Sequence, residues 1–187
     1  MDHYVDIDLR PDPELAPCQL MSALFAKLHR ALVAAPTLGL AVSFPRHDTA
    51  APHLGDRLRL HGSRASLGAL LASGWLTGMR DHVTDTGPAA VPSGAKHRAV
   101  RRVQAQSNPE RLRRRLMKRH RLDAAQARHR IPDSAAENLE LPFIQLRSAS
   151  TGQTFRLFIA HGPIVDEAQA GEVNAYGLSQ TATVPWF

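Results

Sequence analysis

Cysteine is nearly absent from this 187-residue chain, because Cys18 is the only one. A single thiol excludes an internal disulfide and a zinc site built from several thiolates, and it fits a reducing compartment. No apolar run approaches the length of about 18 residues that a membrane-spanning helix needs. The first ten residues, MDHYVDIDLR, lack the basic and apolar segments of a signal peptide. We therefore predict a soluble, cytoplasmic protein with no membrane partner.

Metal-binding motifs are also missing, although the chain has ten histidines. The pairs His47/His53 and His120/His129 do not have the spacing of metal ligands on one helix or in one loop, and there is no HExxH motif. We expect neither a metal ion nor another cofactor.

Acidic residues are scarce in one stretch, residues 95–130, where Glu110 and Asp123 face 13 lysines and arginines. The net charge of this stretch is +11, whereas the rest of the chain carries −5, from 10 basic and 15 acidic residues. Charge segregated in this way indicates a polyanionic partner, and nucleic acid binds such surfaces through its phosphates. An anionic membrane is the competing partner, but a membrane-surface helix needs a broad apolar face that this stretch lacks.

The centre of this basic stretch, SNPERLRRRLMKRHR at Ser107–Arg121, predicts a helix at about 108–120. Asn108 or Ser107 is the expected N-cap, with Pro109 in the first turn, where its missing N–H does no harm. Two leucines beside the charged arc are too few for a bundle helix, and one acidic residue is too few for a helix stabilised by ion pairs. One broad arc of the helix collects the cationic side chains Arg111, Arg114, Arg115, Lys118 and Arg119.

The N-terminal half shows a regular succession of hydrophobic periods. Alternation predicts strands and a period near 3.6 predicts helices. This order, βαββαβ, is typical of the ferredoxin-like fold, so we predict the α+β class. The expected elements are a strand at 3–9, a helix at 18–34, strands at 38–44 and 56–61, a helix at 63–73 and a strand within 79–85.

The C-terminal half follows a linker with two prolines and two glycines at residues 84–96. We therefore divide the chain into a ferredoxin-like domain at 1–94 and a nucleic-acid-binding C-terminal α/β region at 95–187 that carries the arginine-rich helix. The expected elements there are a strand or extended arm at 98–106, the arginine-rich helix, a short helix at 124–130, strands at 142–147 and 154–160, and a packed terminal strand at VPWF.

Three places offer chemistry, and each also has a plain structural interpretation. His29 lies at the edge of the apolar stripe of the first helix, where it is a proton acceptor or simply a boundary histidine. The turn at residues 148–153, SASTGQ, offers hydroxyl and N–H groups to a phosphate, or only closes a hairpin. Tyr176 is one of two tyrosines, and the alternative for it is a buried aromatic with a hydrogen-bonded hydroxyl.

Beyond these features, the chain resembles the type I-F CRISPR repeat-processing endoribonucleases, the Csy-type nucleases, over essentially its whole length. The resemblance is carried by collinear strings: MDHYVDIDLRPDPE, QLMSALFAKLH, RVQAQSNPERLRRRLMKRH, LPFIQLRSASTGQTFRLFIAHGP, YGLS and VPWF. It is weakest at residues 35–55, 83–97 and 165–175. The resemblance implies cleavage of CRISPR repeat hairpins in precursor RNA, and a surveillance complex with other Cas proteins.

The resemblance also implies how the hairpin is recognised. The arginine-rich helix, from Arg111 to Arg119, enters the major groove of the hairpin stem. Arg102 and Gln104 read base pairs at the foot of the stem, which suits the pairing of arginine with guanine and glutamine with adenine. Phe155 stacks under the last base pair.

For cleavage, the resemblance implies chemistry without a metal ion. His29 removes the proton from the ribose 2′-OH, Ser148 orients that ribose, and Tyr176 positions the histidine. Ser150 and Thr151 are assigned to the phosphate. The products are then a 2′,3′-cyclic phosphate and a 5′-hydroxyl, with the enzyme remaining on its product.

Two other functions compete with this one. The first is a non-catalytic RNA-hairpin-binding subunit of a ribonucleoprotein complex, which would use the same basic helix. The second is a regulator that binds double-stranded DNA, but so dense an arginine array contributes phosphate affinity more than sequence readout.

Overall fold

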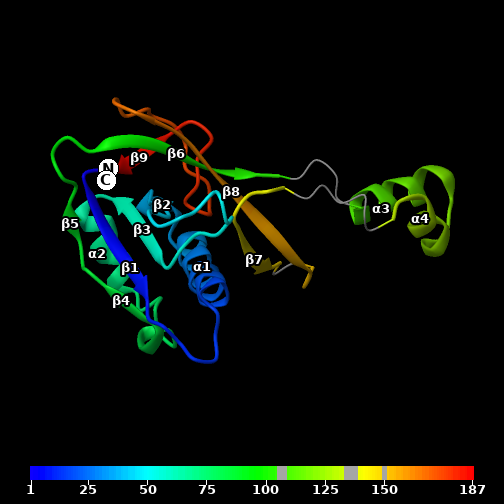
Figure 1. The fold of residues 1–187 in the computed structure, drawn as a ribbon, viewed down its shortest axis with the longest axis horizontal. Coiled ribbons are helices and arrows are strands. Elements are labelled where there is room, and N and C mark those ends of the chain that lie inside the picture. Colours follow the sequence, from blue (N-terminus) through cyan, green and yellow to red (C-terminus); the bar gives the residue numbers. More distant parts are fainter. Residues whose placement is uncertain (105–108, 133–138, 149–150) are drawn as a thin grey trace. The chain divides into compact units, whose positions relative to one another are not determined.

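In a computed structural model of the chain, the alternation at residues 3–9 forms strand β1 (His3–Leu9), an inner strand of an antiparallel sheet (Figure 1). The strand order is β2-β3-β1-β4, and a short fifth strand also pairs with β1. With helices α1 and α2 in the crossovers, this is the βαββαβ order of the ferredoxin-like fold, so the predicted class and arrangement are confirmed. The other strands are β2 (Ala41–Ser43), β3 (Arg57–Gly62), β4 (Val83–Asp85) and β5 (Ala89–Ala90).

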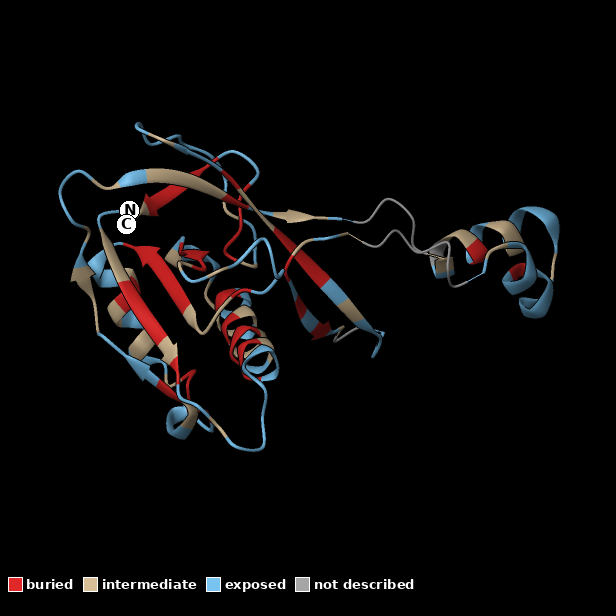
Figure 2. Cartoon of the chain, in the orientation of Figure 1, coloured by how far each residue is buried: buried red, intermediate tan, exposed pale blue. Residues whose placement is uncertain are grey.

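Two helices follow the predicted positions closely. Helix α1 (Pro17–Ala34) begins with a proline, and the Gln19 side chain accepts a hydrogen bond from the Ala16 N–H at 3.0 Å. Helix α2 (Arg64–Ala72) is capped by Ser63, whose Oγ accepts the Ser66 N–H at 3.0 Å. The apolar stripe of α1 is buried along its length (Figure 2), and it consists of Leu20, Met21, Leu24, Phe25, Leu28 and Leu32.

The second face of this sheet is also buried at its centre. Asp6 and Arg59, directly opposite each other on β1 and β3, are only 4% and 5% exposed. They form a bidentate ion pair with N···O distances of 2.6 and 2.8 Å, which satisfies both buried charges. The Arg59 guanidinium also contacts the rings of Tyr4 and Phe187, which meet edge-on with centroids 4.9 Å apart. Phe187, which follows β9, thus covers this face.

A second antiparallel sheet has the order β7-β8-β6-β9. All strands of this second sheet follow residue 95, and all strands of the first sheet precede residue 91. We therefore keep the domain boundary near 94–95 as a proposal. The predicted linker at 84–96 is shorter than expected, because β5 pairs with β1 inside it. The packed terminal strand is confirmed. The four strands are β6 (Lys96–Val103), β7 (Phe143–Arg147), β8 (Thr154–Val165) and β9 (Thr183–Trp186).

The structure describes residues 1–104, 109–132, 139–148 and 151–187. Their contacts divide the chain into one unit of residues 1–102 with 141–187, which holds both sheets, and another of residues 103–140. The second unit contains α3 (Pro109–His120) and α4 (Ala124–Arg130), close to the predicted helices. Over the described ranges, no helix is long and apolar enough to span a bilayer.

Candidate nucleic-acid interface and active site

Helix α3 packs against α4 through the side opposite its cationic arc. Arg113 lies two residues before Arg115 and therefore on the other side of the helix. It is 7% exposed, and its Nε donates to the carbonyl oxygen of Ile131, the C-cap of α4, at 2.7 Å. Ala127 of α4 is fully buried, and Leu112 and Leu116 are half-buried. One arginine of the helix therefore joins the two helices rather than facing solvent.

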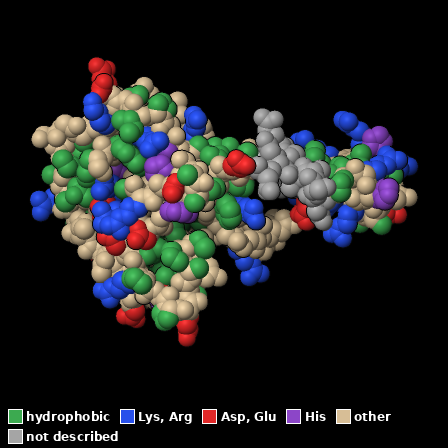
Figure 3. Space-filling model, in the orientation of Figure 1, with side chains coloured by type: hydrophobic (Ala, Val, Ile, Leu, Met, Phe, Trp, Pro, Cys, Tyr) green, Lys and Arg blue, Asp and Glu red, His purple; other side chains and the backbone are tan. Residues whose placement is uncertain are grey.

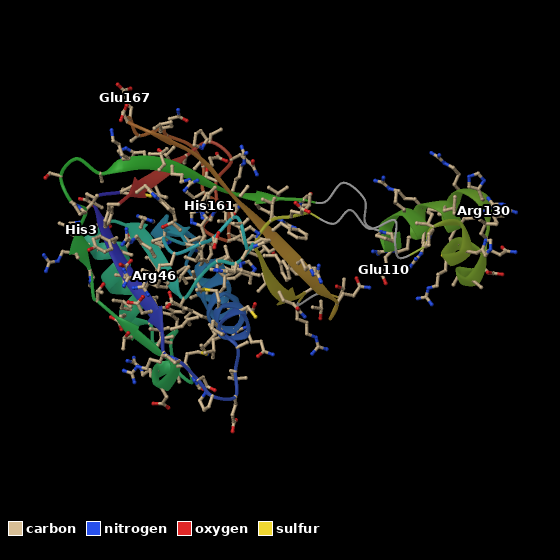
Figure 4. All side chains as sticks on the ribbon, viewed as in Figure 1. His3, Arg46, Glu110, Arg130, His161 and Glu167 are labelled. Carbon is tan, nitrogen blue, oxygen red and sulfur yellow. The ribbon has the colours of Figure 1, made fainter. Side chains whose placement is uncertain are left out.

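Four members of the cationic arc are open to solvent. Figure 3 shows Lys and Arg side chains over the unit that holds α3 and α4, and Figure 4 labels Glu110 at the start of α3 and Arg130 at the end of α4. The helix starts at Pro109; the predicted caps Ser107 and Asn108 lie outside the described residues. Arg111 belongs to the first turn of the helix. The exposed members of the predicted arc are Arg114, Arg115, Lys118 and Arg119.

In the other unit, His29 of α1 is held by residues far away in sequence. Its Nδ1 lies 2.8 Å from the carbonyl oxygen of Ala175. A carbonyl only accepts, so in the neutral imidazole the hydrogen sits on Nδ1 and the lone pair on Nε2. The ring of Tyr176 lies parallel to the imidazole, with centroids 4.1 Å apart and planes inclined by 12°. The structure thus brings together two of the three residues that the resemblance assigns to catalysis.

Arg102 extends this group by one member. Its guanidinium carbon lies 5.5 Å from the centre of the Tyr176 ring. Its Nε is buried without a hydrogen-bond partner in the described part of the chain, and its carbonyl oxygen accepts the Gln180 side-chain amide at 2.9 Å. A buried donor of this kind is costly unless a ligand accepts from it. Gln104 is exposed and follows β6 by one residue, so its placement on the same strand face stays a prediction.

The sequence analysis missed the turn that presents Ala175 and Tyr176. Asn174 accepts the N–H groups of Tyr176 and Leu178 through its Oδ1, at 2.8 and 3.3 Å. Gly177 has a φ of 73°, a backbone conformation that favours glycine. The sequence NAYG, in which Gly comes three residues after Asn, is typical of a turn and could have predicted this one.

Ser148 lies where β7 ends, in the turn that leads to β8. Its N–H donates to the Gln153 carbonyl at 2.8 Å, and its Oγ accepts the Thr151 N–H at 3.2 Å, so the hydroxyl is held by the turn. The strand before it is tied to α1, because Ser22 Oγ accepts the Gln145 N–H at 3.2 Å. Of the two predicted phosphate ligands, Thr151 is exposed within this turn and Ser150 lies outside the described residues.

Phe155 is half-buried on β8, opposite Leu146, and packs against the hydrophobic core. Its predicted stacking on a base pair stays a prediction. Two other histidines of this unit are held neutral by burial, which lowers the pKa of His61 and of His161 to about 3. Among the described residues, no group of three or more histidine, cysteine, aspartate or glutamate side chains gathers as a metal site would require.

Comparisons with known proteins cover the entire chain. The profile of the family described as "CRISPR-associated protein (Cas_Csy4)" matches residues 4–187. The chain is 58% identical over 187 residues to a protein of Pseudomonas aeruginosa (strain UCBPP-PA14) named "CRISPR-associated endonuclease Cas6/Csy4", with both chains covered completely. It is 46% identical, again over the full length of both chains, to a protein of the same name from Escherichia coli (strain UTI89 / UPEC).

Proposed function

Because the chain belongs to the Cas_Csy4 family of CRISPR-associated proteins, as its sequence predicts, we propose that it cleaves CRISPR repeat hairpins in precursor RNA to give mature guide RNAs. Its full-length relatives are named endonucleases, so the predicted enzyme class is confirmed. The observation that carries the active-site assignment is the 2.8 Å hydrogen bond between His29 Nδ1 and the Ala175 carbonyl oxygen. It leaves Nε2 as the proton acceptor.

The chemistry we propose is an internal transesterification without a metal ion. Nε2 of His29 takes the proton of the ribose 2′-OH, and the 2′-oxygen forms a bond to the adjacent phosphorus. The bond from phosphorus to the 5′-oxygen breaks, and this oxygen takes up a proton. The products are a 2′,3′-cyclic phosphate and a 5′-hydroxyl.

In this proposal Ser148 orients the ribose, and Thr151 and Ser150 bind the phosphate. Support for Ser148 comes from two hydrogen bonds: its hydroxyl is held by the Thr151 N–H, and its strand is tied to α1 through Ser22 and Gln145. His29 is seven residues, nearly two turns, after Ser22 on α1, and so shares its side of that helix. Alignment of the 2′-oxygen with the phosphorus is worth several orders of magnitude in rate.

Hairpin binding divides between the two units. In our proposal the exposed basic side chains of α3, together with Arg111, neutralise phosphates of the stem, while Arg102 and Gln104 read base edges. The Nε–H of Arg102 has no partner among the described residues and lies beside Tyr176. This supports the role, because it puts a base-reading group next to the proposed catalytic pair. Phe155 then stacks under the last base pair.

The second candidate function, a non-catalytic hairpin-binding subunit, is favoured by the same exposed arc of α3. The two functions are compatible if the enzyme stays on its product and joins a complex with other Cas proteins, as we propose. They differ in what they require of His29, which only catalysis needs.

Single-turnover cleavage of a repeat hairpin in EDTA tests the proposal. We expect His29→Ala to abolish cleavage and to bind the hairpin with nearly unchanged affinity, since phosphate contacts supply most of the affinity. A 2′-deoxy substitution upstream of the scissile phosphate should have the same effect. His82→Ala, a histidine paired with Asp12 at 3.1 Å, is the matched control and should cleave normally. Normal cleavage of the deoxy substrate would show that water is the nucleophile.

A further inference from the structure

The turn at residues 174–178 is closed almost entirely by one residue, Asn174. Its side-chain Oδ1 accepts two N–H groups, those of Tyr176 and Leu178. Its backbone N–H donates to the Leu178 carbonyl at 2.9 Å, and its carbonyl accepts the Gly177 N–H at 2.8 Å. Because both groups that face the side-chain amide are donors, its oxygen and not its nitrogen must point into the turn.

The turn is fixed to the first sheet on its other side. The Gly177 carbonyl accepts the Val42 N–H of β2 at 2.9 Å, and a Cβ on Gly177 would lie 2.8 Å from Val42 Cγ1. Leu178 is fully buried. Val42 and Leu178 therefore anchor the end of the turn, and the hydrogen bonds of Asn174 set the path of its middle, residues 175 and 176.

That middle is the part that holds His29. The Ala175 carbonyl receives the hydrogen bond from Nδ1, and the Tyr176 ring lies parallel to the imidazole. Free neutral imidazole exchanges its hydrogen between two nitrogens, whereas a proton acceptor at Nε2 requires it on Nδ1. The tautomer and the ring plane therefore both depend on the shape of this turn.

We propose that Asn174 is a positioning residue of the active site, whose side-chain amide oxygen holds the turn in the shape that presents the Ala175 carbonyl and the Tyr176 ring to His29. The inference rests on the proposed role of His29 as the proton acceptor. Asn174 is exposed, so shortening its side chain removes two hydrogen bonds and leaves no cavity in the core.

A pair of substitutions isolates the accepting oxygen. Asn174→Ala removes it, while Asn174→Asp keeps an oxygen of the same reach that accepts the same N–H groups. We expect Asn174→Ala to slow single-turnover cleavage at least about tenfold with the hairpin Kd within about twofold, and Asn174→Asp to stay within about threefold of the parent rate. A failure of the aspartate variant to restore the rate overturns the proposal.

The nitrogen NMR shifts of the His29 imidazole, identified against His29→Ala, provide a readout that does not depend on cleavage. At alkaline pH the parent and Asn174→Asp should show a protonated Nδ1 and an unprotonated Nε2, and Asn174→Ala should show shifts averaged between tautomers. Unchanged shifts in Asn174→Ala overturn the proposal, even if its rate falls. If His29→Ala still cleaves RNA, the proposed function fails instead, and the tautomer measurement still decides the role of Asn174.

Discussion

The ring of Tyr176, rather than its hydroxyl group, makes the contact with His29, since the two rings are stacked at 4.1 Å. Residues 29 and 176 come from elements far apart in the chain, and the stack restricts the imidazole to one plane. The guanidinium carbon of Arg102 lies 5.5 Å from the centre of the same tyrosine ring, so one aromatic side chain contacts both the proposed proton acceptor and a proposed base reader.

Tyr176→Phe should therefore cost less than about tenfold in cleavage rate, because the ring stays, and Tyr176→Ala should cost more, because the plane of the imidazole is then free. Single-turnover rates at saturating enzyme measure both. Equal losses in the two variants would assign the role to the hydroxyl group and contradict the stacking argument.

Much of the fold is predictable from sequence because hydrophobic period and turn chemistry agree along the chain. The strand at 3–9 and the helix at 124–130 have the predicted bounds, and Ser63 caps α2 at the predicted start. The alternation of apolar and polar residues along β1 is enough to predict which of its sides packs against the helices. It does not predict that the other side, with Asp6, is buried, because the strand partner Arg59 and the covering residue Phe187 are distant in sequence.

The candidate site shows the same limit. His29 and Tyr176 are identified only through a family resemblance, because nothing in their local sequence shows that their rings meet. The holding group on His29 is a backbone carbonyl, and any residue at position 175 would supply it. Side-chain patterns give no sign of such a contact. The opposed roles of Arg113 and Arg115, by contrast, follow from helical geometry once the partner helix α4 is known.

Arg119→Ala should weaken binding to every hairpin and flatten its salt dependence. One phosphate contact fewer lowers the slope of log K against log salt by about one. Fluorescence anisotropy across a salt series measures this slope.

Arg113→Ala is the matched control for the arginine on the other side of α3. We expect this substitution to lower the free energy of unfolding by about 1–3 kcal/mol, because the Ile131 carbonyl at the end of α4 loses its hydrogen-bond donor. Its salt slope should equal that of the parent protein. A flattened slope in Arg113→Ala would show that the inner side of α3 also contacts phosphates.

Gln104→Ala should relax discrimination at a single base pair, by about 1–3 kcal/mol, and leave the salt slope unchanged, because a base-edge contact releases no counterions. Competition between hairpins that differ at one pair of the stem foot measures it. A uniform loss across all competitors would identify Gln104 as a backbone contact.

Acid should destabilise the unit that holds both sheets well before its carboxylates are protonated. His161 of β8, labelled in Figure 4, is stacked on His47 with centroids 3.6 Å apart, and its ring lies edge-on to that of Trp186. Burial first, and then the charges of His47 and Arg98, lower the pKa of His161 to about 3, and burial does the same for His61.

The pH range of this effect follows from the two pKa values of each histidine. Unfolded histidine titrates near 6.5, so between about pH 6.5 and 3 the unfolded chain binds protons that the folded chain does not, and the free energy of unfolding falls as the pH falls. His161→Phe keeps an aromatic ring without a titrating group. Urea unfolding at pH 7.5, 6.0 and 5.0 measures the free energy of unfolding as a function of pH. The slope of this dependence should be shallower in His161→Phe than in the parent protein, by up to about 1.4 kcal/mol per pH unit. Parallel slopes would mean that His161 accepts a proton in the folded state, and that its stacking on His47 does not hold it neutral.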